Sequence, residues 1–133
     1  MKNPSTKTMK GEFPEVFQAL RSILLEHTTK LTVTKDNQEL FYADMKGKMY
    51  RGKPLCFGGV RLGKNYVSYY LMPAYMNPKL QGKISPELKK HMQGKACFNF
   101  KHIDKSLFKE LTAITVTGLK MFENINESTF AGS

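Results

Sequence analysis

A chain of 133 residues with 41% hydrophobic and 24% charged residues has the size and composition of one globular domain, which excludes a wholly disordered chain. Its longest strictly aliphatic run is Ile23–Leu25, and no apolar stretch follows its basic N-terminus, so we expect neither a membrane partner nor a signal peptide. Cys56 and Cys97 form no CxxC motif. We interpret them as reduced, buried thiols of a cytoplasmic protein, with a single disulfide as the alternative.

The net charge of +10 is concentrated in the middle of the chain. Residues 46–105 contain 13 Lys and Arg, opposed only by Glu87 and Asp104, whereas the segments on either side are close to neutral. Any electrostatic function is therefore predicted for residues 46–105, which we call the basic segment.

Spacing and capping chemistry predict the elements. Apolar residues from Phe13 onwards recur at helical spacing, and β-branched or aromatic runs bounded by Gly, Pro and Asn predict strands. Ser85 before Pro86, and Asp104, are typical of helix starts. The expected elements are an arm (1–11), a helix (13–27), a hairpin (31–34 with 39–43), a basic loop (46–54), a second hairpin (55–62 with 65–72), an irregular crossing opened by Pro73 and Pro78, a short helix (86–92), a strand (96–100), a final helix capped by Asp104 and a tail (125–133).

These elements predict an α+β fold in the order α-β-β-β-β-α-β-α. We expect a mostly antiparallel, twisted sheet of about five strands, with the N-terminal and C-terminal helices packed on it. A single domain is expected over residues 12–124, between a flexible arm at 1–11 and a flexible tail at 125–133.

Two glycine-containing patterns resemble nucleotide-binding motifs without meeting their requirements. Gly47-x-x-x-x-Gly52-Lys53 matches most of a phosphate-binding P-loop, but Pro54 replaces the required Ser or Thr and leads into a strand. Gly58-Gly59 lies within a predicted strand, where it indicates a β-bulge or a close backbone approach. We predict no catalytic site, no metal site and no cofactor, since no His, Cys or carboxylate spacing matches one.

Strand alternation predicts one polar sheet face. Tyr66, Ser68 and Tyr70 share a face opposite Val67, Tyr69 and Leu71, and Asn99 with Cys97 opposes Phe98 and Phe100. A partly covered polar face of this kind can line a ligand cleft, although half-buried packing tyrosines are the simpler interpretation. The candidate ligand-binding or anion-binding residues are Lys53, Arg61, Lys64, Tyr66, Ser68, Tyr70, Asn99 and Lys101.

Three blocks of residues carry a resemblance to a known family. They are Phe57-Gly-x-Val60, Lys64-x-Tyr-Val-Ser-Tyr-x-Leu-Met-Pro-x-Tyr75 and Ser85-Pro-Glu-Leu-Lys-Lys-x-Met-Gln-Gly-Lys-x-Cys-Phe-Asn-Phe100, followed by Lys101. The chain resembles, over about residues 55–122, a small bacterial family of uncharacterised domains related to the YdhG-like group. The resemblance implies a frataxin-like α+β fold and no established activity.

The same resemblance bears on a metal role. Some YdhG-like proteins are described as iron chaperones, but the acidic ridge that such a role suggests is missing from this basic chain. Members of the family often carry His where this chain has Tyr70, so a His-dependent role is not carried over to that position.

These observations indicate three candidate functions. The first is a non-enzymatic binding module for an anionic partner, such as an anionic ligand or a nucleic acid, through the basic segment and its tyrosines. The alternative is a small-molecule site, with or without enzymatic activity, on the face of Tyr66, Ser68, Tyr70 and Asn99. A frataxin-like metal chaperone is disfavoured. The oligomeric state is left open, with a homodimer as one option.

Overall fold

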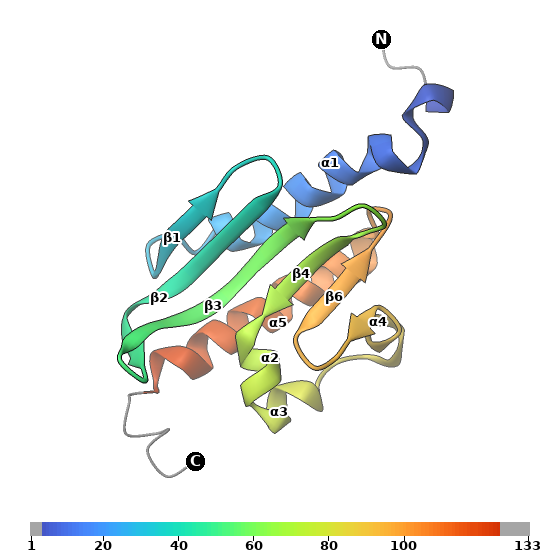
Figure 1. The fold of residues 1–133 in the computed structure, drawn as a ribbon. Coiled ribbons are helices and arrows are strands. Elements are labelled where there is room, and N and C mark those ends of the chain that lie inside the picture. Colours follow the sequence, from blue (N-terminus) through green and yellow to red (C-terminus); the bar gives the residue numbers. More distant parts are fainter. Residues whose placement is uncertain (1–3, 126–133) are drawn as a thin grey trace.

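A single antiparallel sheet with two long helices on one face organises the protein (Figure 1). The computed structural model describes the backbone of residues 4–125 and the side chains of residues 12–125. The strands are β1 (Leu31–Asp36), β2 (Leu40–Tyr50), β3 (Lys53–Leu62), β4 (Val67–Leu71), β5 (Met92–Gln93) and β6 (Cys97–Phe100). The helices are α1 (Pro4–Leu25), α2 (Met72–Met76), α3 (Pro78–Gln81), α4 (Pro86–Lys89) and α5 (Lys105–Glu123).

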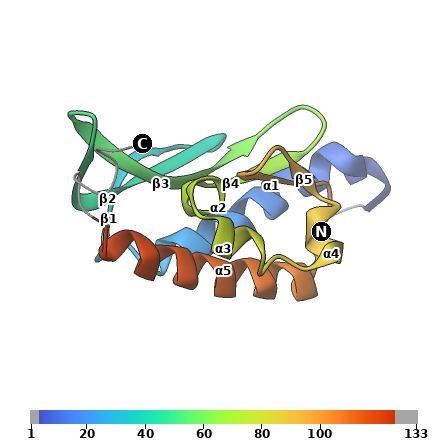
Figure 2. The ribbon, with the colours of Figure 1, turned by 90° about the horizontal axis from the view of Figure 1, so that it is seen from below.

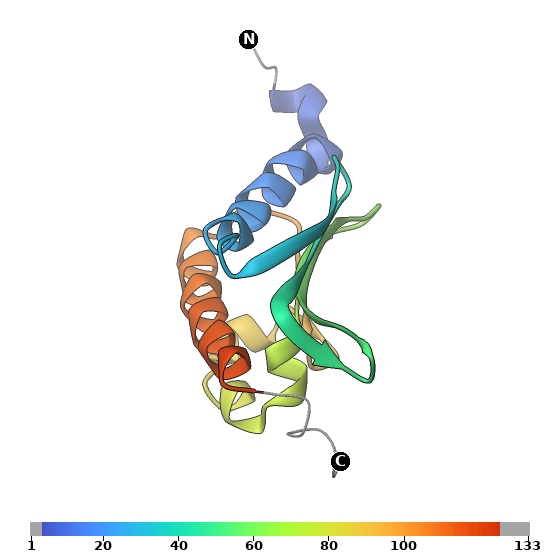
Figure 3. The ribbon, with the colours of Figure 1, turned by 90° about the vertical axis from the view of Figure 1, so that its left-hand side faces the viewer.

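The two faces of the sheet have different surroundings. The strand order is β1-β2-β3-β4-β6-β5, and every neighbouring pair is antiparallel. Helices α1 and α5 pack against the same face, as Figure 3 shows from the side, and Figure 2 shows α5 running below the sheet. The opposite face carries no helix within the described chain. We call these the covered face and the uncovered face.

The predicted α+β class, with a mostly antiparallel sheet and both terminal helices packed on it, is confirmed. The details between β4 and β6 differ from the expectation of one helix and about five strands. Three short helices lie there, and β5 adds a sixth strand of two residues. Pro73, Pro78 and Pro86 each stand in the first turn of one of these helices, where a missing N–H costs no hydrogen bond. The expected irregular crossing is therefore a run of short helical turns.

Alternating side chains along the strands build the core. Val67, Tyr69 and Leu71 on β4 are fully buried on the covered face, as predicted. The apolar positions of the two long helices meet them, and all are 8% exposed or less: Phe13, Val16, Phe17, Leu20, Ile23, Leu24, Leu107, Phe108, Leu111, Ile114, Leu119 and Phe122. Burial of this continuous apolar layer is the main stabilising term for the fold.

One polar side chain and one glycine shape the contact between α5 and the rest of the core. Thr115 is buried, and its hydroxyl shares a 2.6 Å hydrogen bond with the Tyr69 hydroxyl. Gly118 lies against α2, since a Cβ there would come within 2.8 Å of the Pro73 side chain. Helix α5 therefore approaches both the sheet and α2 closely at these two positions.

A bulge interrupts the pairing of β2 with β3. Phe57 and Val60 both point into the core although they are three residues apart, which requires one extra residue between them. Gly59 faces the ring of Tyr42, and a Cβ at Gly59 would lie 1.9 Å from that ring. The close approach predicted for Gly58-Gly59 is confirmed, and the register shift lies next to this pair, at Phe57.

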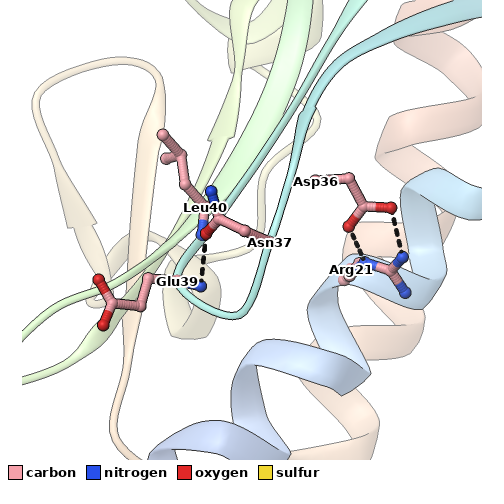
Figure 4. Close-up of polar contacts among 5 residues, drawn as sticks. All are labelled: Arg21, Asp36, Asn37, Glu39 and Leu40. Atoms are coloured by element: carbon pink, nitrogen blue, oxygen red, sulfur yellow. Dashed lines mark hydrogen bonds and ion pairs between the residues drawn. The ribbon is translucent and has the colours of Figure 1, made fainter.

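The β1–β2 hairpin is fixed to α1 by polar contacts. Arg21 donates to both carboxylate oxygens of Asp36 at 2.9 and 2.7 Å, and its guanidinium lies 5.3 Å from the centre of the Phe41 ring. Asn37 Oδ1 accepts from the backbone N–H groups of Glu39 and Leu40, which closes the turn (Figure 4). The hairpin expected over residues 31–34 and 39–43 is confirmed. The register of the edge strand β1 also shifts between Val33 and Lys35.

Helix α1 begins earlier than expected. It starts at Pro4 and continues through Pro14, which the sequence placed in a first turn. An internal proline removes one backbone hydrogen bond and bends a helix, and Figure 1 shows that the axis of α1 is bent. The expected arm at 1–11 therefore falls partly within a helix, and residues 1–3 lie outside the described chain. Residues 126–133 of the expected tail also lie outside it.

The basic loop expected over residues 46–54 is wrong. Residues 46–50 continue β2, residues 53–54 begin β3, and only Arg51 and Gly52 form the turn between them. Gly47 has a positive φ of 70° where the register of the pair is irregular. Pro54 lies in a strand, as expected, whereas a P-loop would be followed by a helix.

The predicted helix caps are confirmed. Ser85 Oγ accepts from the N–H of Leu88, and Asp104 Oδ1 accepts from the N–H of Leu107. Helix α4 ends at Lys89, earlier than the predicted residue 92, because Met92 and Gln93 pair with β6. Within the described residues, no helix combines the length and apolar content that crossing a membrane requires.

Candidate functional site

The uncovered face carries ordered rows of polar and aromatic side chains. Strand pairing aligns Arg61 of β3 with Ser68 of β4, and Ser68 with Asn99 of β6. The next row aligns Tyr42, Gly59, Tyr70 and Cys97. Because side chains alternate along a strand, these residues share the face opposite to α1 and α5. The strand register therefore puts Ser68, Tyr70 and Asn99 on one face, as expected.

Hydrogen bonds tie the polar residues of the first row to one another. Ser68 Oγ donates to Asn99 Oδ1 at 2.6 Å, and Asn99 Nδ2 donates to Gln93 Oε1 at 3.1 Å. The Tyr66 hydroxyl donates to the same Gln93 oxygen at 3.4 Å. The Asn99 carboxamide uses both of its ends and is held in one orientation, so this part of the face is preorganised.

A hollow of about 250 Å³ opens at the β3–β4 turn, on one side of Tyr66. Arg61, Lys64, Tyr66 and Ser68 line it together with Gly63 and Asn65. Four of the eight predicted site residues therefore meet in one place, and two of them are cations.

A second hollow of about 380 Å³ also reaches Tyr66 and is lined in part by Asn99, Lys101, His91, His102 and Asp104. The His91 ring stacks on Phe100 at 4.6 Å, and its Nδ1 donates to the Asn99 carbonyl at 2.9 Å. His102 Nδ1 lies 2.6 Å from Glu12 Oε1.

The two hollows share Tyr66 and together contain six of the predicted residues. We call this arrangement the Tyr66 site, made of Arg61, Lys64, Tyr66, Ser68, Asn99 and Lys101.

The cations of the basic segment are not neutralised within the described chain. The Lys and Arg ion pairs there are Arg21–Asp36 and Lys30–Glu123, His102 lies against Glu12, and none of these involves a Lys or Arg from residues 46–105. Lys48 donates to the backbone carbonyl of Ile125 at 2.7 Å. Arg61, Lys64 and Lys101 thus present their charge to the solvent at the Tyr66 site, where an anion would meet it.

Two predicted residues lie apart from the Tyr66 site. Lys53 stands at the opposite end of β3 from Arg61. Tyr70 lies one row away, and its hydroxyl donates to the sulfur of Met72 at 3.4 Å. The structure therefore does not bring Lys53 and Tyr70 together with the other six.

The groups around Tyr70 are held in their neutral forms. Burial, followed by the neighbouring Cys56 and Cys97 thiols, raises the pKa of Tyr70 to about 12. Burial and the nearby Asp44 carboxylate raise the pKa of Cys56 to about 11, and burial also raises the pKa of Cys97. At neutral pH these three side chains are a phenol and two thiols, which bind by packing and hydrogen bonding rather than by charge. Both cysteines are free.

No cluster of three or more His, Cys, Asp or Glu side chains is found in the described part of the chain. A divalent cation therefore has no ready-made ligand set among these residues.

Two features of the uncovered face were missed by the sequence reasoning. Tyr42 joins the face because it pairs with Gly59, and the alternation of Tyr42 with the buried Phe41 and Ala43 could have indicated this. A further hollow of about 460 Å³ lies at the β2–β3 hairpin end of the sheet, beside α2. It depends on the contact between two elements far apart in sequence, for which no local signal exists.

No model of a known protein family, no curated protein and no solved structure matches this chain. The assignment of a function therefore depends on the residues and the geometry described above.

Proposed function

We propose that the protein is a non-enzymatic binding module for an anionic partner, and that this partner is a single-stranded nucleic acid held at the Tyr66 site. The observation that supports this most directly is the meeting of Arg61, Lys64 and Lys101 around Tyr66, without a carboxylate partner among the described residues. Cations at this position would neutralise backbone phosphates. An aromatic side chain between them offers a surface on which an unpaired base stacks.

The rest of the uncovered face supports a single strand rather than a duplex. The Tyr42 ring lies against Gly59 on the uncovered face, since a Cβ at Gly59 would come within 1.9 Å of the ring. Tyr70 lies on the far side of Gly59 in the same row. An antiparallel sheet that presents aromatic rings on an open face is a geometry that binds splayed, unpaired bases.

Fluorescence anisotropy with a labelled 15-nucleotide oligothymidylate, titrated at several salt concentrations, tests this proposal. The affinity should fall with salt, with a log–log slope of about −0.7 for each neutralised phosphate and thus about −2 for three contacts. The combined variant Arg61→Gln, Lys64→Gln, Lys101→Gln should lose most of the slope. A duplex of the same length should bind more weakly.

A charge-matched control separates a site from general basicity. The combined variant Lys79→Gln, Lys83→Gln, Lys109→Gln removes three exposed cations away from the Tyr66 site. It should retain the affinity of the unmodified protein within about threefold, since distant screened charges contribute little. Equal losses in the two combined variants would refute a site at Tyr66 and leave only non-specific attraction.

The hydrogen-bonded network favours one second candidate, a small anionic molecule in the same hollows. The fixed Asn99 carboxamide and the Ser68 hydroxyl are polar groups of the kind that orient a small ligand. In that case a mononucleotide would bind as tightly as the 15-nucleotide strand. The titration described above, repeated with mononucleotide as competitor, distinguishes the two.

We also propose that the chain shares the frataxin-like fold of the YdhG-like group. The support is the three sequence blocks within residues 55–122 and the α+β class with an antiparallel sheet. Superposition of an experimental structure of this protein on a YdhG-like domain tests it. A different strand order in the two sheets would refute the proposal.

A further inference from the structure

The hollow at the β2–β3 hairpin end of the sheet has an apolar wall and a basic rim. Its volume is about 460 Å³, larger than either hollow at Tyr66 and within the range of small-molecule sites. It is bounded by the end of the hairpin and by α2, which Figure 1 shows at the lower part of the sheet. We call it the hairpin pocket; its lining residues are Tyr50, Arg51, Lys53, Pro54, Leu55, Cys56, Met72, Tyr75 and Met76.

The wall of the hairpin pocket is suited to an apolar ligand body. Pro54, Met72 and Met76 supply aliphatic and thioether surface, and methionines adapt readily to ligands of different shape. Tyr75 is 58% exposed, which is an unusually high exposure for a large aromatic side chain. The Cys56 thiol, with its pKa raised to about 11, is neutral and adds to the apolar surface at neutral pH.

The turn at the rim holds a residue whose side chain does not suit the local backbone conformation. Arg51 and Gly52 have φ values of 54° and 80°, so both central residues of this two-residue turn are left-handed. Such turns favour Asn-Gly or Asp-Gly, because a Cβ is strained at positive φ and only a short polar side chain compensates by bonding locally. Arg51 is the one non-glycine residue with positive φ among the described residues. Local conflicts of this kind concentrate at functional sites.

The charge of the rim is all of one sign. Arg51 lies over the Tyr50 ring at 5.2 Å, which holds its guanidinium at the pocket, and Lys53 follows two residues later. The lining includes no Asp or Glu, and neither cation forms an ion pair within the described chain. The pocket therefore combines an apolar wall with positive charge at one edge, which is complementary to an amphipathic anion.

We propose that the hairpin pocket binds a free small molecule with an apolar body and a single carboxylate group. The apolar body would lie against Pro54, Met72 and Met76, and the carboxylate would meet Arg51 and Lys53. The concave shape and limited volume favour a single molecule over a membrane surface. This site is separate from the Tyr66 site, because Lys53 and Arg61 are at opposite ends of β3, roughly 25 Å apart along an extended strand.

Displacement of the fluorescent dye 8-anilinonaphthalene-1-sulfonate by decanoate and by decanol tests the proposal. Both competitors have the same apolar chain, but only decanoate carries a charge. Decanoate should displace the dye at roughly tenfold lower concentration than decanol, because Arg51 and Lys53 meet only the charged head. Equal potency of the two competitors, or no displacement by decanoate, would overturn the proposal.

The variant Arg51→Asn provides a readout that unfolding cannot imitate. It should weaken decanoate binding about fivefold and leave decanol binding unchanged. It should also raise the Tm by a few degrees, since Asn adopts the left-handed turn with less strain. Binding and stability would thus move in opposite directions.

Lys83→Asn, which removes an exposed cation outside the pocket, is the matched control and should leave both affinities unchanged. Met76→Gln should weaken decanoate and decanol alike. If Arg51→Asn and Lys83→Asn affect decanoate equally, the assigned role of Arg51 is refuted. Neither Arg51→Asn nor decanoate should change oligothymidylate binding, so this test is independent of the one at the Tyr66 site.

Discussion

Tyr69 and Tyr70 are neighbours on β4, yet they belong to two different environments. Tyr69 points to the covered face, is fully buried, and shares its hydroxyl with Thr115 of α5. Tyr70 points to the uncovered face, is half-buried, and donates to the sulfur of Met72. The same residue type thus contributes mainly to stability on one face and is available for recognition on the other, because alternation along the strand separates the two tasks.

The difference between the faces should be largest for the neighbouring pair Phe98 and Asn99 on β6. Phe98→Ala removes a fully buried ring from the covered face and should lower the free energy of unfolding by about 3–5 kcal/mol. Asn99→Ala changes a partly exposed side chain of the uncovered face and should cost less than about 1 kcal/mol. Urea unfolding monitored by circular dichroism measures both. Similar losses for the two variants would contradict the division between the faces.

The buried hydrogen bond between Tyr69 and Thr115 should account for a smaller part of the stability of the covered face. Thr115→Val leaves the Tyr69 hydroxyl without a partner in the core, so it should lower the free energy of unfolding by about 1–3 kcal/mol. Adding Tyr69→Phe removes the unpaired group and should recover about 1 kcal/mol of that loss. A double-mutant cycle from chemical unfolding measures the coupling. Strict additivity of the two substitutions would show that this hydrogen bond contributes nothing.

The smallest expected effect concerns the pKa of Cys56, which shows that part of the uncovered face is also shielded from water. Burial, and then the Asp44 carboxylate, raise the pKa of Cys56 from its ordinary value of 9.0 to about 11. Asp44→Asn removes the negative charge that disfavours the thiolate, so the pKa of Cys56 should fall, yet remain above 9.0 because burial is the larger cause. The rate of alkylation by iodoacetamide as a function of pH, in a Cys97→Ala background, measures this. An unchanged midpoint would show that Asp44 does not act on Cys56.

Asp44 itself adds a dependence of stability on pH. Burial raises its pKa above the ordinary 3.8, so the folded chain binds this proton more tightly than the unfolded chain. The contribution of Asp44 to stability is therefore most favourable at pH below 3.8 and is lost as the pH rises through the raised pKa. Asp44→Asn should remove this component of the pH profile in the same unfolding measurements.

Local chemistry was sufficient to predict much of the fold. The caps at Ser85 and Asp104, the alternation of β4, and the close approach at Gly58-Gly59 each depend on a few neighbouring residues. The extent of β2 could not be predicted in this way. Residues 46–50 have the glycine and lysine content of a loop, yet they continue the strand, and Met49 and Tyr50 pair with Pro54 and Lys53 of β3. The Arg51-Gly52 turn also lacks the asparagine that usually identifies a two-residue hairpin.

The sequence predicted which residues belong to the candidate site better than it predicted how they are arranged. Alternation placed Tyr66, Ser68 and Asn99 on one face, and strand pairing then brought six of the eight residues together. The separation of Lys53 from Arg61 follows from the length of β3, which the predicted loop had shortened. The role of Tyr42 depends on its register against Gly59, which alternation alone does not specify.

The shifted register of β1 has a consequence for how copies of the protein meet. An edge strand with regular pairing presents a line of free N–H and C=O groups, on which a strand from another molecule can add. In β1 the shift between Val33 and Lys35 breaks this line and places a lysine beside the break. At the other edge, β5 offers only two residues. Both borders of the sheet are poor templates for intermolecular strand addition, which protects the protein from aggregation through its sheet.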